Sequence, residues 1–264
     1  MTRTNTTYDR RSVLKAAGAT AMAASVAGCS RVMGQRADGT TLLPPENHDR
    51  LEDVDLPFPT YGDELPTATV PAPLHDREVT TTEFVGERHT MLTFIYTSCT
   101  TVCPGLTATL RRVQGDAIEE GYDGEITFQA MTFDPEHDTA DVLESYGRDM
   151  GVDFEVGNWY FLRPETPETA EEVVEDTFGV AFEGGGMDGG EMNVNSDEMN
   201  GDGEGAADDG RSDDDGDHDG HDRHFQHASL ILLVNDEGIV ERAYNGGPPN
   251  PSTVIEDVRT VVEA

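Results

Sequence analysis

TMLTFIYTSCTTVCPGLTATL, residues Thr90–Leu110, joins a strand pattern to a helix pattern and decides the fold of this chain. The run Met91–Thr97 is almost continuously apolar or β-branched, which is typical of a central strand buried on both faces. Pro104 fits the first position of a helix, where its missing N–H costs no hydrogen bond. The thiols of Cys99 and Cys103 therefore lie where a buried strand meets the first turn of a helix.

The position and spacing of the two thiols indicate their chemistry. Free backbone N–H groups and the positive end of the helix dipole favour thiolate at Cys99 and Cys103, the form that attacks disulfides or binds metal. Three residues separate the cysteines, against two in the usual redox pair, so both sulfurs can face one ion and can still form a disulfide. Two thiolates suit Cu(I), and an added imidazole also suits Cu(II). A structural disulfide is the alternative, although so short a loop gains little closure stability.

Strand and helix patterns continue along the rest of the chain from residue 68. Strands are predicted at Ala68–Leu74, Glu78–Thr81, Glu125–Phe133, Trp159–Leu162, Ala228–Val234 and Ile239–Tyr244, and helices from Pro104 to Gly121 and at Asp138–Met150, Glu165–Phe178 and Pro251–Val262. Strands that alternate with helices, followed by a strand hairpin and a closing helix, predict an α/β fold. With a Cys pair after the first long strand, the order indicates a thioredoxin-like core, a central mixed sheet flanked by helices.

The composition is strongly acidic. The 264 residues include 53 acidic and 17 basic ones, a formal net charge of −36. An acidic surface stays hydrated and soluble in strong salt, so the chain is interpreted as coming from a salt-loving organism. The alternative is that one acidic segment supplies the whole excess, but acids such as Glu171 and Glu172 lie outside it. Nothing resembles a basic patch, so nucleic acid is not an expected partner.

The N-terminal residues 1–29 have the pattern of an export signal. Arg10-Arg11 resembles a twin-arginine signature, Ala16–Ala27 is a short apolar core, and the run ending at Cys29 resembles a lipobox. We expect Cys29 to carry the lipid that anchors the chain to the extracytoplasmic face of the cell membrane. An ordinary signal, or an anchor helix with a chance cysteine, is the alternative. Residues 30–67 are rich in proline and acids and are predicted to be a flexible linker to the domain at 68–264.

A second composition change falls inside that domain. Residues 183–224 consist mainly of Gly, Asp, Glu and Asn and are predicted to be a disordered acidic insert. Near its end His218, His221 and His224 recur every three residues among aspartates, and His227 continues the series directly before the strand at Ala228–Val234. The insert is either a copper-collecting loop or a solvated loop with incidental histidines. In a thioredoxin-like core the loop entering that strand lies against the Cys loop, which favours His227 over His224 as the imidazole donor. The other histidines, His48, His75, His89 and His137, are expected to be surface residues.

Three motifs in order resemble the SCO/SenC family. They are YTSCTTVCP at 96–104, DPEHDT at 134–139, and HAS at 227–229 before an apolar strand and NDEG. The resemblance spans residues 68–263 and implies a membrane-tethered, thioredoxin-like copper protein that helps to assemble the binuclear copper centre of cytochrome c oxidase subunit II. It implies that Cys99, Cys103 and His227 are the copper ligands.

The same resemblance makes the DPEHDT motif a loop beside the site, where Asp134 is expected to orient neighbouring groups rather than ligate copper. The alternative is a turn and helix cap before Asp138. The sequence departs from the family at Thr100, Thr101 and Val102, where Pro and Asp are frequent, and at Gln226, where Asp is frequent.

Three functions follow from these patterns. The first is a copper chaperone that delivers copper to the oxidase subunit. The second is a thiol–disulfide oxidoreductase that keeps the oxidase cysteines reduced, with Cys99 attacking and Cys103 resolving. The third is a metal buffer that acts through the insert. His227 separates the first two, since a pure reductase has no use for an imidazole there.

Overall fold

The computed structural model describes residues 37–46, 48, 54, 56–182 and 229–264. The predicted signal at 1–29 with its lipid cysteine Cys29, the acidic insert at 183–224 with His218, His221 and His224, and the proposed ligand His227 lie outside the described residues. None of the helices in the described part of the chain combines the length and hydropathy of a membrane span.

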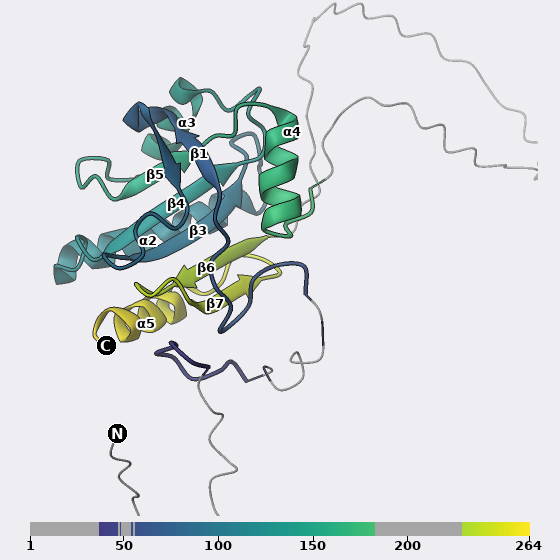
Figure 1. Ribbon diagram of the computed structural model, residues 1–264. Helices are drawn as coiled ribbons and strands as arrows, with labels where there is room; N and C mark the ends of the chain where they lie inside the picture. Colours follow the sequence, from purple (N-terminus) through teal and green to yellow (C-terminus); the bar gives the residue numbers. More distant parts are fainter. Residues whose placement is uncertain (1–36, 47, 49–53, 55, 183–228) are drawn as a thin grey trace, which may run out of the picture. The chain divides into compact units, whose positions relative to one another are not determined.

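A five-stranded mixed sheet forms the centre of the domain (Figure 1). Its strand order is β5-β4-β3-β6-β7, with β3 at His89–Ile95, β4 at Ile126–Thr132, β5 at Trp159–Leu162, β6 at Leu230–Val234 and β7 at Val240–Asn245. The strands β3, β4 and β5 are parallel, whereas β6 is antiparallel to both β3 and β7. Together with the flanking helices, this sheet confirms the predicted α/β, thioredoxin-like fold.

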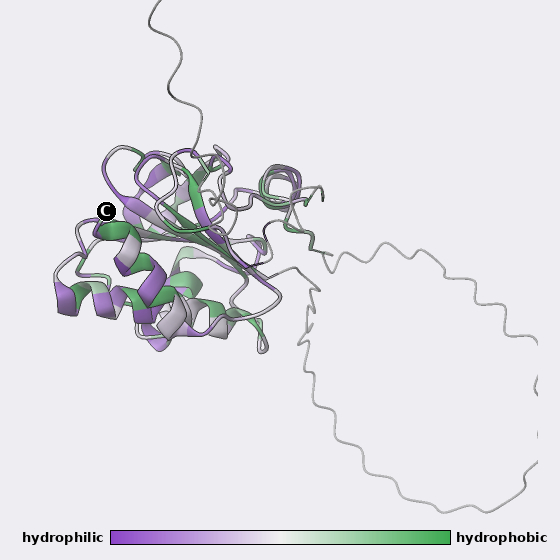
Figure 2. Ribbon diagram, turned by 90° about the horizontal axis from the view of Figure 1, so that it is seen from below, coloured by the Kyte–Doolittle hydropathy of each residue, from purple (hydrophilic) through white to green (hydrophobic). Residues whose placement is uncertain are grey.

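The three middle strands form the core. Every residue of β3, β4 and β6 is buried, as the apolar, β-branched runs predict for strands covered on both faces. In Figure 2, green hydrophobic segments run through the sheet, while the helices carry both hydrophobic and hydrophilic residues. A small hairpin of β1 (Thr69–Ala72) and β2 (Arg77–Thr80) lies against β5, where Arg163 N–H donates to Pro71 O at 2.9 Å.

The helices flank the sheet. They are α2 at Cys103–Glu120, α3 at Ala140–Asp149, α4 at Pro167–Ala170, its π-helical continuation η3 at Glu171–Thr177, and α5 at Pro251–Val262. Helices α2 and α5 pack together, and Arg259 of α5 forms ion pairs with Asp116 and Glu120 of α2. Helix α2 begins at Cys103, one residue before the predicted start, with Pro104 in its first turn.

Two predicted helices are shorter at their N-terminal ends. Helix α4 begins at Pro167 because the Thr166 side chain caps it by accepting a hydrogen bond from Thr169 N–H. Helix α3 begins at Ala140 because Thr139 is the cap residue and accepts from Val142 N–H. Asp138, which was predicted to be helical, lies before the helix, and its carboxylate accepts hydrogen bonds from Thr97 and Thr132.

Part of the predicted linker is packed structure. Leu42, Tyr61 and Leu65 are buried, and the N–H groups of Thr41 and Leu42 donate to the Glu241 carboxylate at 2.6 and 2.9 Å. The expectation of a flexible linker through residue 67 is therefore wrong for the described residues from 37 onward. In this segment isolated apolar residues are buried along an extended chain. The sequence therefore shows neither a helical nor an alternating hydrophobic period there.

Two histidines expected at the surface are also placed differently. His89 is only 8% exposed, and burial lowers the pKa of its imidazole. His75 Nε2 lies 2.9 Å from the carbonyl oxygen of Trp159, and its ring contacts that of Tyr160. Both residues are part of the packing around the sheet.

Replacing the buried acid that holds the N-terminal segment tests this packing. Glu241 is fully buried and also accepts from Asn235 Nδ2 at 2.8 Å, so Glu241→Ala leaves three donors without their acceptor. We expect the free energy of unfolding, measured by urea denaturation, to fall by about 1–3 kcal/mol. Proteolytic cleavage within residues 37–65 should become faster.

The matched control is Glu256→Ala, which removes an exposed glutamate from α5. It should change neither the unfolding free energy nor the cleavage pattern. An equal loss in both variants would contradict a specific role for Glu241.

Candidate metal and thiol site

Cys99 and Cys103 lie at the junction of β3 and α2, as predicted. A turn follows β3, in which Cys99 N–H donates to Tyr96 O at 3.2 Å. Both cysteines are buried and are not joined by a disulfide, and Cys99 is the more exposed, at 5% against 0%. The Cys103 N–H points at the Cys99 sulfur at 3.4 Å, and the Thr101 hydroxyl lies 3.5 Å from the same sulfur. One donor from the first turn of α2, the Cys103 N–H, and the Thr101 hydroxyl just before the helix thus both lie near the Cys99 sulfur.

These contacts make the two thiols unequal. Burial raises the pKa of Cys99, but hydrogen bonds from the Thr101 side chain and from the main chains of Cys103 and Thr101 outweigh it and lower the pKa to about 6. Burial raises the pKa of the Cys103 thiol well above its usual range. At neutral pH Cys99 is a thiolate, able to attack or to bind a soft metal, while Cys103 keeps its proton.

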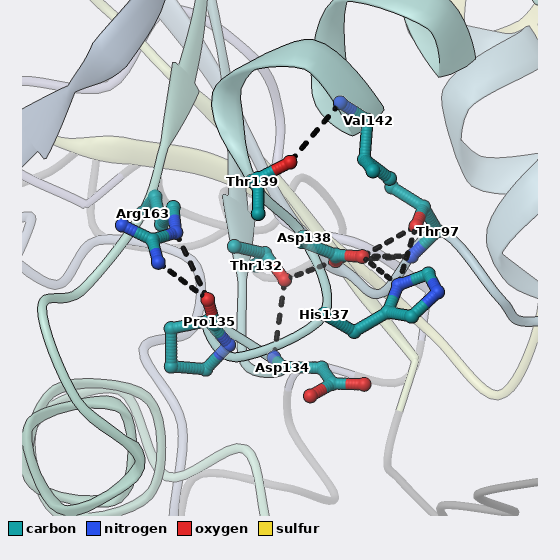
Figure 3. A network of polar contacts seen from close by, with 9 residues as sticks. All are labelled: Thr97, Thr132, Asp134, Pro135, His137, Asp138, Thr139, Val142 and Arg163. Carbon is teal, nitrogen blue, oxygen red and sulfur yellow. Dashed lines mark hydrogen bonds and ion pairs between the residues drawn. The ribbon is translucent and has the colours of Figure 1, made fainter. Parts of the chain in front are cut away.

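A buried carboxylate is hydrogen-bonded to the turn at 96–99, which is called the Cys turn below. Asp138 is 0% exposed and accepts from Thr97 N–H at 3.0 Å, from the hydroxyls of Thr97 and Thr132, and from His137 Nδ1 at 2.9 Å (Figure 3). These partners belong to the turn after β3, the end of β4 and the loop before α3. The sequence analysis missed this role. The signal that could have found it is Thr139, which directly follows Asp138 and can itself cap the helix, so the aspartate is left for another use.

Asp134 is placed at the turn of the same loop. It is 3% exposed, its N–H donates to Thr132 Oγ1 at 3.1 Å, and its carbonyl accepts from Asp138 N–H at 2.9 Å. The helix cap is Thr139, so the expected turn forms while the cap is a different residue. From the other side, the Arg163 guanidinium donates to Pro135 O at 3.0 and 2.6 Å, a contact that the sequence analysis did not foresee.

The chain enters β6 beside the Cys loop. Ser229 and Leu230 line a cavity of about 560 Å³ together with Val102, which stands between the two cysteines. The Thr93 hydroxyl of β3 donates to Leu230 O at 2.8 Å and fixes this entry point. Loop residue Pro248 packs so closely on α2 that a Cβ on Gly105 would lie 2.4 Å from its ring.

The described residues supply two donors for a metal ion. Among them, no group of three or more His, Cys, Asp or Glu side chains is arranged to hold one. Two sulfurs at the start of one helix nevertheless fit a soft, low-coordinate ion, since thiolates prefer Cu(I) and zinc over hard cations.

Comparison with known proteins now identifies the domain. Residues 74–198 match the family model described as SCO1/SenC. The chain carries a SCO1/SenC family domain. The matched range contains both cysteines and the loop at 134–139, and it ends before His227. A comparison with curated protein sequences gives no match.

Solved structures of the SCO1/SenC family share the fold. The crystal structure of a SCO1/SenC family lipoprotein from Bacillus anthracis matches with a TM-score of 0.53 and 18% identity, over 75% of this chain and 94% of that one. The crystal structure of yeast Sco1 with copper bound matches with a TM-score of 0.50 and 16% identity, over 78% and 90%. At these identities the likeness shows the fold.

The unequal thiols of the SCO1/SenC domain predict a distinctive alkylation profile. Iodoacetamide should label Cys99 with a rate that rises with pH around a midpoint of about 6, because the thiolate is the reacting form. Peptide mass spectrometry, with Cys103 monitored in the same samples, measures it. Thr101→Val removes one donor to the sulfur and should move the midpoint upward.

Thr100→Val is the matched control, since it removes a neighbouring exposed hydroxyl. A Cys99 midpoint near that of an ordinary thiol in the parent chain, or equal shifts in both variants, would contradict the assignment.

Proposed function

We propose that this chain is a membrane-tethered copper chaperone that delivers copper to the binuclear copper centre of cytochrome c oxidase subunit II. The observation that carries the proposal is the Cys pair on a SCO1/SenC domain, in which the Cys103 N–H at the start of α2 lies 3.4 Å from the Cys99 sulfur. Copper is the cargo of this site. The copper-bound yeast Sco1 of the same fold supports that choice of metal.

Cys99, Cys103 and His227 are the proposed ligands. Ser229 lines the same cavity as Val102, so the chain reaches β6 directly beside the Cys loop. His227 is two residues before Ser229, and two residues span about 7 Å at most. This short separation supports His227, rather than a histidine further back in the chain, as the imidazole donor. Two sulfurs hold Cu(I), and the imidazole extends the site to Cu(II). Asp134 orients the surrounding groups, as a member of the adjacent loop.

Copper leaves this site by ligand exchange. Cys99 is the more exposed sulfur, so an acceptor thiolate replaces it first, and the buried Cys103 is released second. The accepting cysteines gain each bond as one is lost, so the ion never becomes free. Delivery occurs at the extracytoplasmic face of the membrane, where the twin-arginine signal and the lipid on Cys29 place the domain. The net charge of −36 over the whole chain suits a protein that stays soluble in strong salt.

A thiol–disulfide oxidoreductase is the second candidate, favoured by the unequal thiols. The Cys99 thiolate would attack a disulfide of the oxidase subunit, form a mixed disulfide and release one partner thiolate, which takes up a proton. Cys103 would lose its proton and attack the Cys99 sulfur, releasing the second partner thiolate. Two electrons pass to the partner, and Cys99 and Cys103 end as a disulfide. A metal buffer built on His218, His221 and His224 is the third candidate.

Copper titration of the reduced chain separates these functions. The parent should bind one copper ion per chain in a competition assay with a chromogenic chelator. Cys99→Ser should lose tight Cu(I) binding, and His227→Ala should keep Cu(I) but lose at least about tenfold in Cu(II) affinity. Deleting residues 183–223 should leave one tight site. His48→Ala serves as the matched histidine control and should match the parent.

Three results would contradict the proposal. Unchanged Cu(II) affinity in His227→Ala would remove the imidazole from the site. Loss of stoichiometric binding on deletion of residues 183–223 would make the insert the metal site. A parent that binds no copper yet reduces a disulfide of the oxidase subunit would favour the oxidoreductase.

A further inference from the structure

We propose that Asp138 is the positioning residue of the Cys pair: its buried carboxylate holds the turn at 96–99 in the conformation that brings both sulfurs together. The inference deepens the proposed function, on which its copper measurements rest. The network that carries it is drawn in Figure 3.

The carboxylate is fully buried and surrounded by donors. Two of them come from Thr97, through its N–H at 3.0 Å and its hydroxyl, one from the Thr132 hydroxyl, and one from His137 Nδ1 at 2.9 Å. Burying a charge is costly unless hydrogen bonds replace its water, and bonds to a charged acceptor are stronger than neutral ones. Moving the turn away from Asp138 would therefore leave the buried carboxylate without hydrogen-bond donors, which costs free energy.

The turn that Asp138 holds contacts both sulfurs. Thr97 is the second residue of the turn closed by the hydrogen bond from Cys99 N–H to Tyr96 O at 3.2 Å. A hydrogen bond from the Tyr96 main chain acts on the Cys103 thiol. The turn therefore carries Cys99 at one end and touches the Cys103 sulfur at the other, and Asp138 anchors it in the middle.

Asp138 itself lies in a loop that is held by hydrogen bonds at both ends. Its N–H donates to Asp134 O at 2.9 Å, and the guanidinium of Arg163 fixes Pro135 O from the β5 side. Thr139 caps α3, so the Asp138 side chain is not needed for the helix. A hydrogen-bonded loop that directs one carboxylate at the turn at 96–99 is an arrangement that positions the reactive groups.

Replacement of Asp138 tests the proposal in two assays. Asp138→Asn should lower Cu(I) affinity at least about tenfold, the usual cost of losing a group that orients metal ligands. In glutathione buffers, where the dithiol and glutathione disulfide exchange for the protein disulfide and two glutathiones, its equilibrium constant should fall about tenfold, or about 30 mV for two electrons. The Cu(II)–thiolate absorption band should also shift.

Thr97 gives a milder variant pair that leaves the charge of Asp138 in place. Thr97→Ala removes one hydroxyl donor and should shift both assays in the same direction by a smaller factor, whereas Thr97→Ser keeps the hydroxyl and should restore parent values. Asp141→Asn removes an exposed charge from the start of α3 and should match the parent. Asp116→Asn weakens the α2–α5 ion pair and lowers stability without touching the turn, so it should also match.

The outcomes separate the two proposals. Asp138→Asn that is folded by circular dichroism and matches the parent in both assays would overturn the role of Asp138. Equal effects in Asp141→Asn or Asp116→Asn would overturn it as well, since they would mark long-range charge or general instability. A parent without copper binding would end the chaperone proposal, while the glutathione assay would still decide the role of Asp138.

Discussion

The hydrogen bonds between the buried carboxylate of Asp138 and the Thr97 N–H and hydroxyl connect the sheet to the thiols. β3 and β4 are parallel neighbours, so both strands end at the same edge of the sheet, and Asp138 bridges those two ends through Thr97 and Thr132. Helix α2 begins at Cys103, and the Cys103 N–H is directed at the Cys99 sulfur. The two thiols and the carboxylate that holds their turn therefore lie at one edge of the sheet.

The geometry that suits copper also suits thiol exchange. Hydrogen-bond donors that lower the pKa of Cys99 make it both a ligand for a soft ion and a nucleophile. The buried Cys103 acts second in either reaction, as the last sulfur to release copper or as the thiol that resolves the mixed disulfide. The two functions differ in what the loop entering β6 supplies. An imidazole at His227 is useful to a copper site and has no role in disulfide reduction, so the proposed function depends on a residue two positions before Ser229.

Sequence patterns predicted the strand–helix junction because local chemistry determines it. The β-branched run before Cys99 and Pro104 after it allow little else, and the strand Trp159–Leu162 and the helix Pro251–Val262 match their predicted bounds. Contacts between residues far apart in the sequence could not be predicted. No residue near Asp138 in the sequence indicates that its carboxylate accepts from Thr97, 41 positions earlier. Likewise, no residue near Thr41 indicates that its N–H donates to Glu241, 200 positions later. The ligand role of His227 stays a prediction for the same reason, since it depends on where β6 enters the sheet.

Amide hydrogen exchange at Thr97 tests the anchoring of the Cys turn most directly. Thr97 follows the last strand residue of β3 by two positions, and its N–H has the Asp138 carboxylate as its acceptor. The account predicts slow exchange at Thr97 in the reduced parent chain, and exchange at least about tenfold faster in Asp138→Asn, while Leu92 inside β3 remains protected in both. Rapid exchange at Thr97 in the parent, or no difference between the two chains, would contradict it.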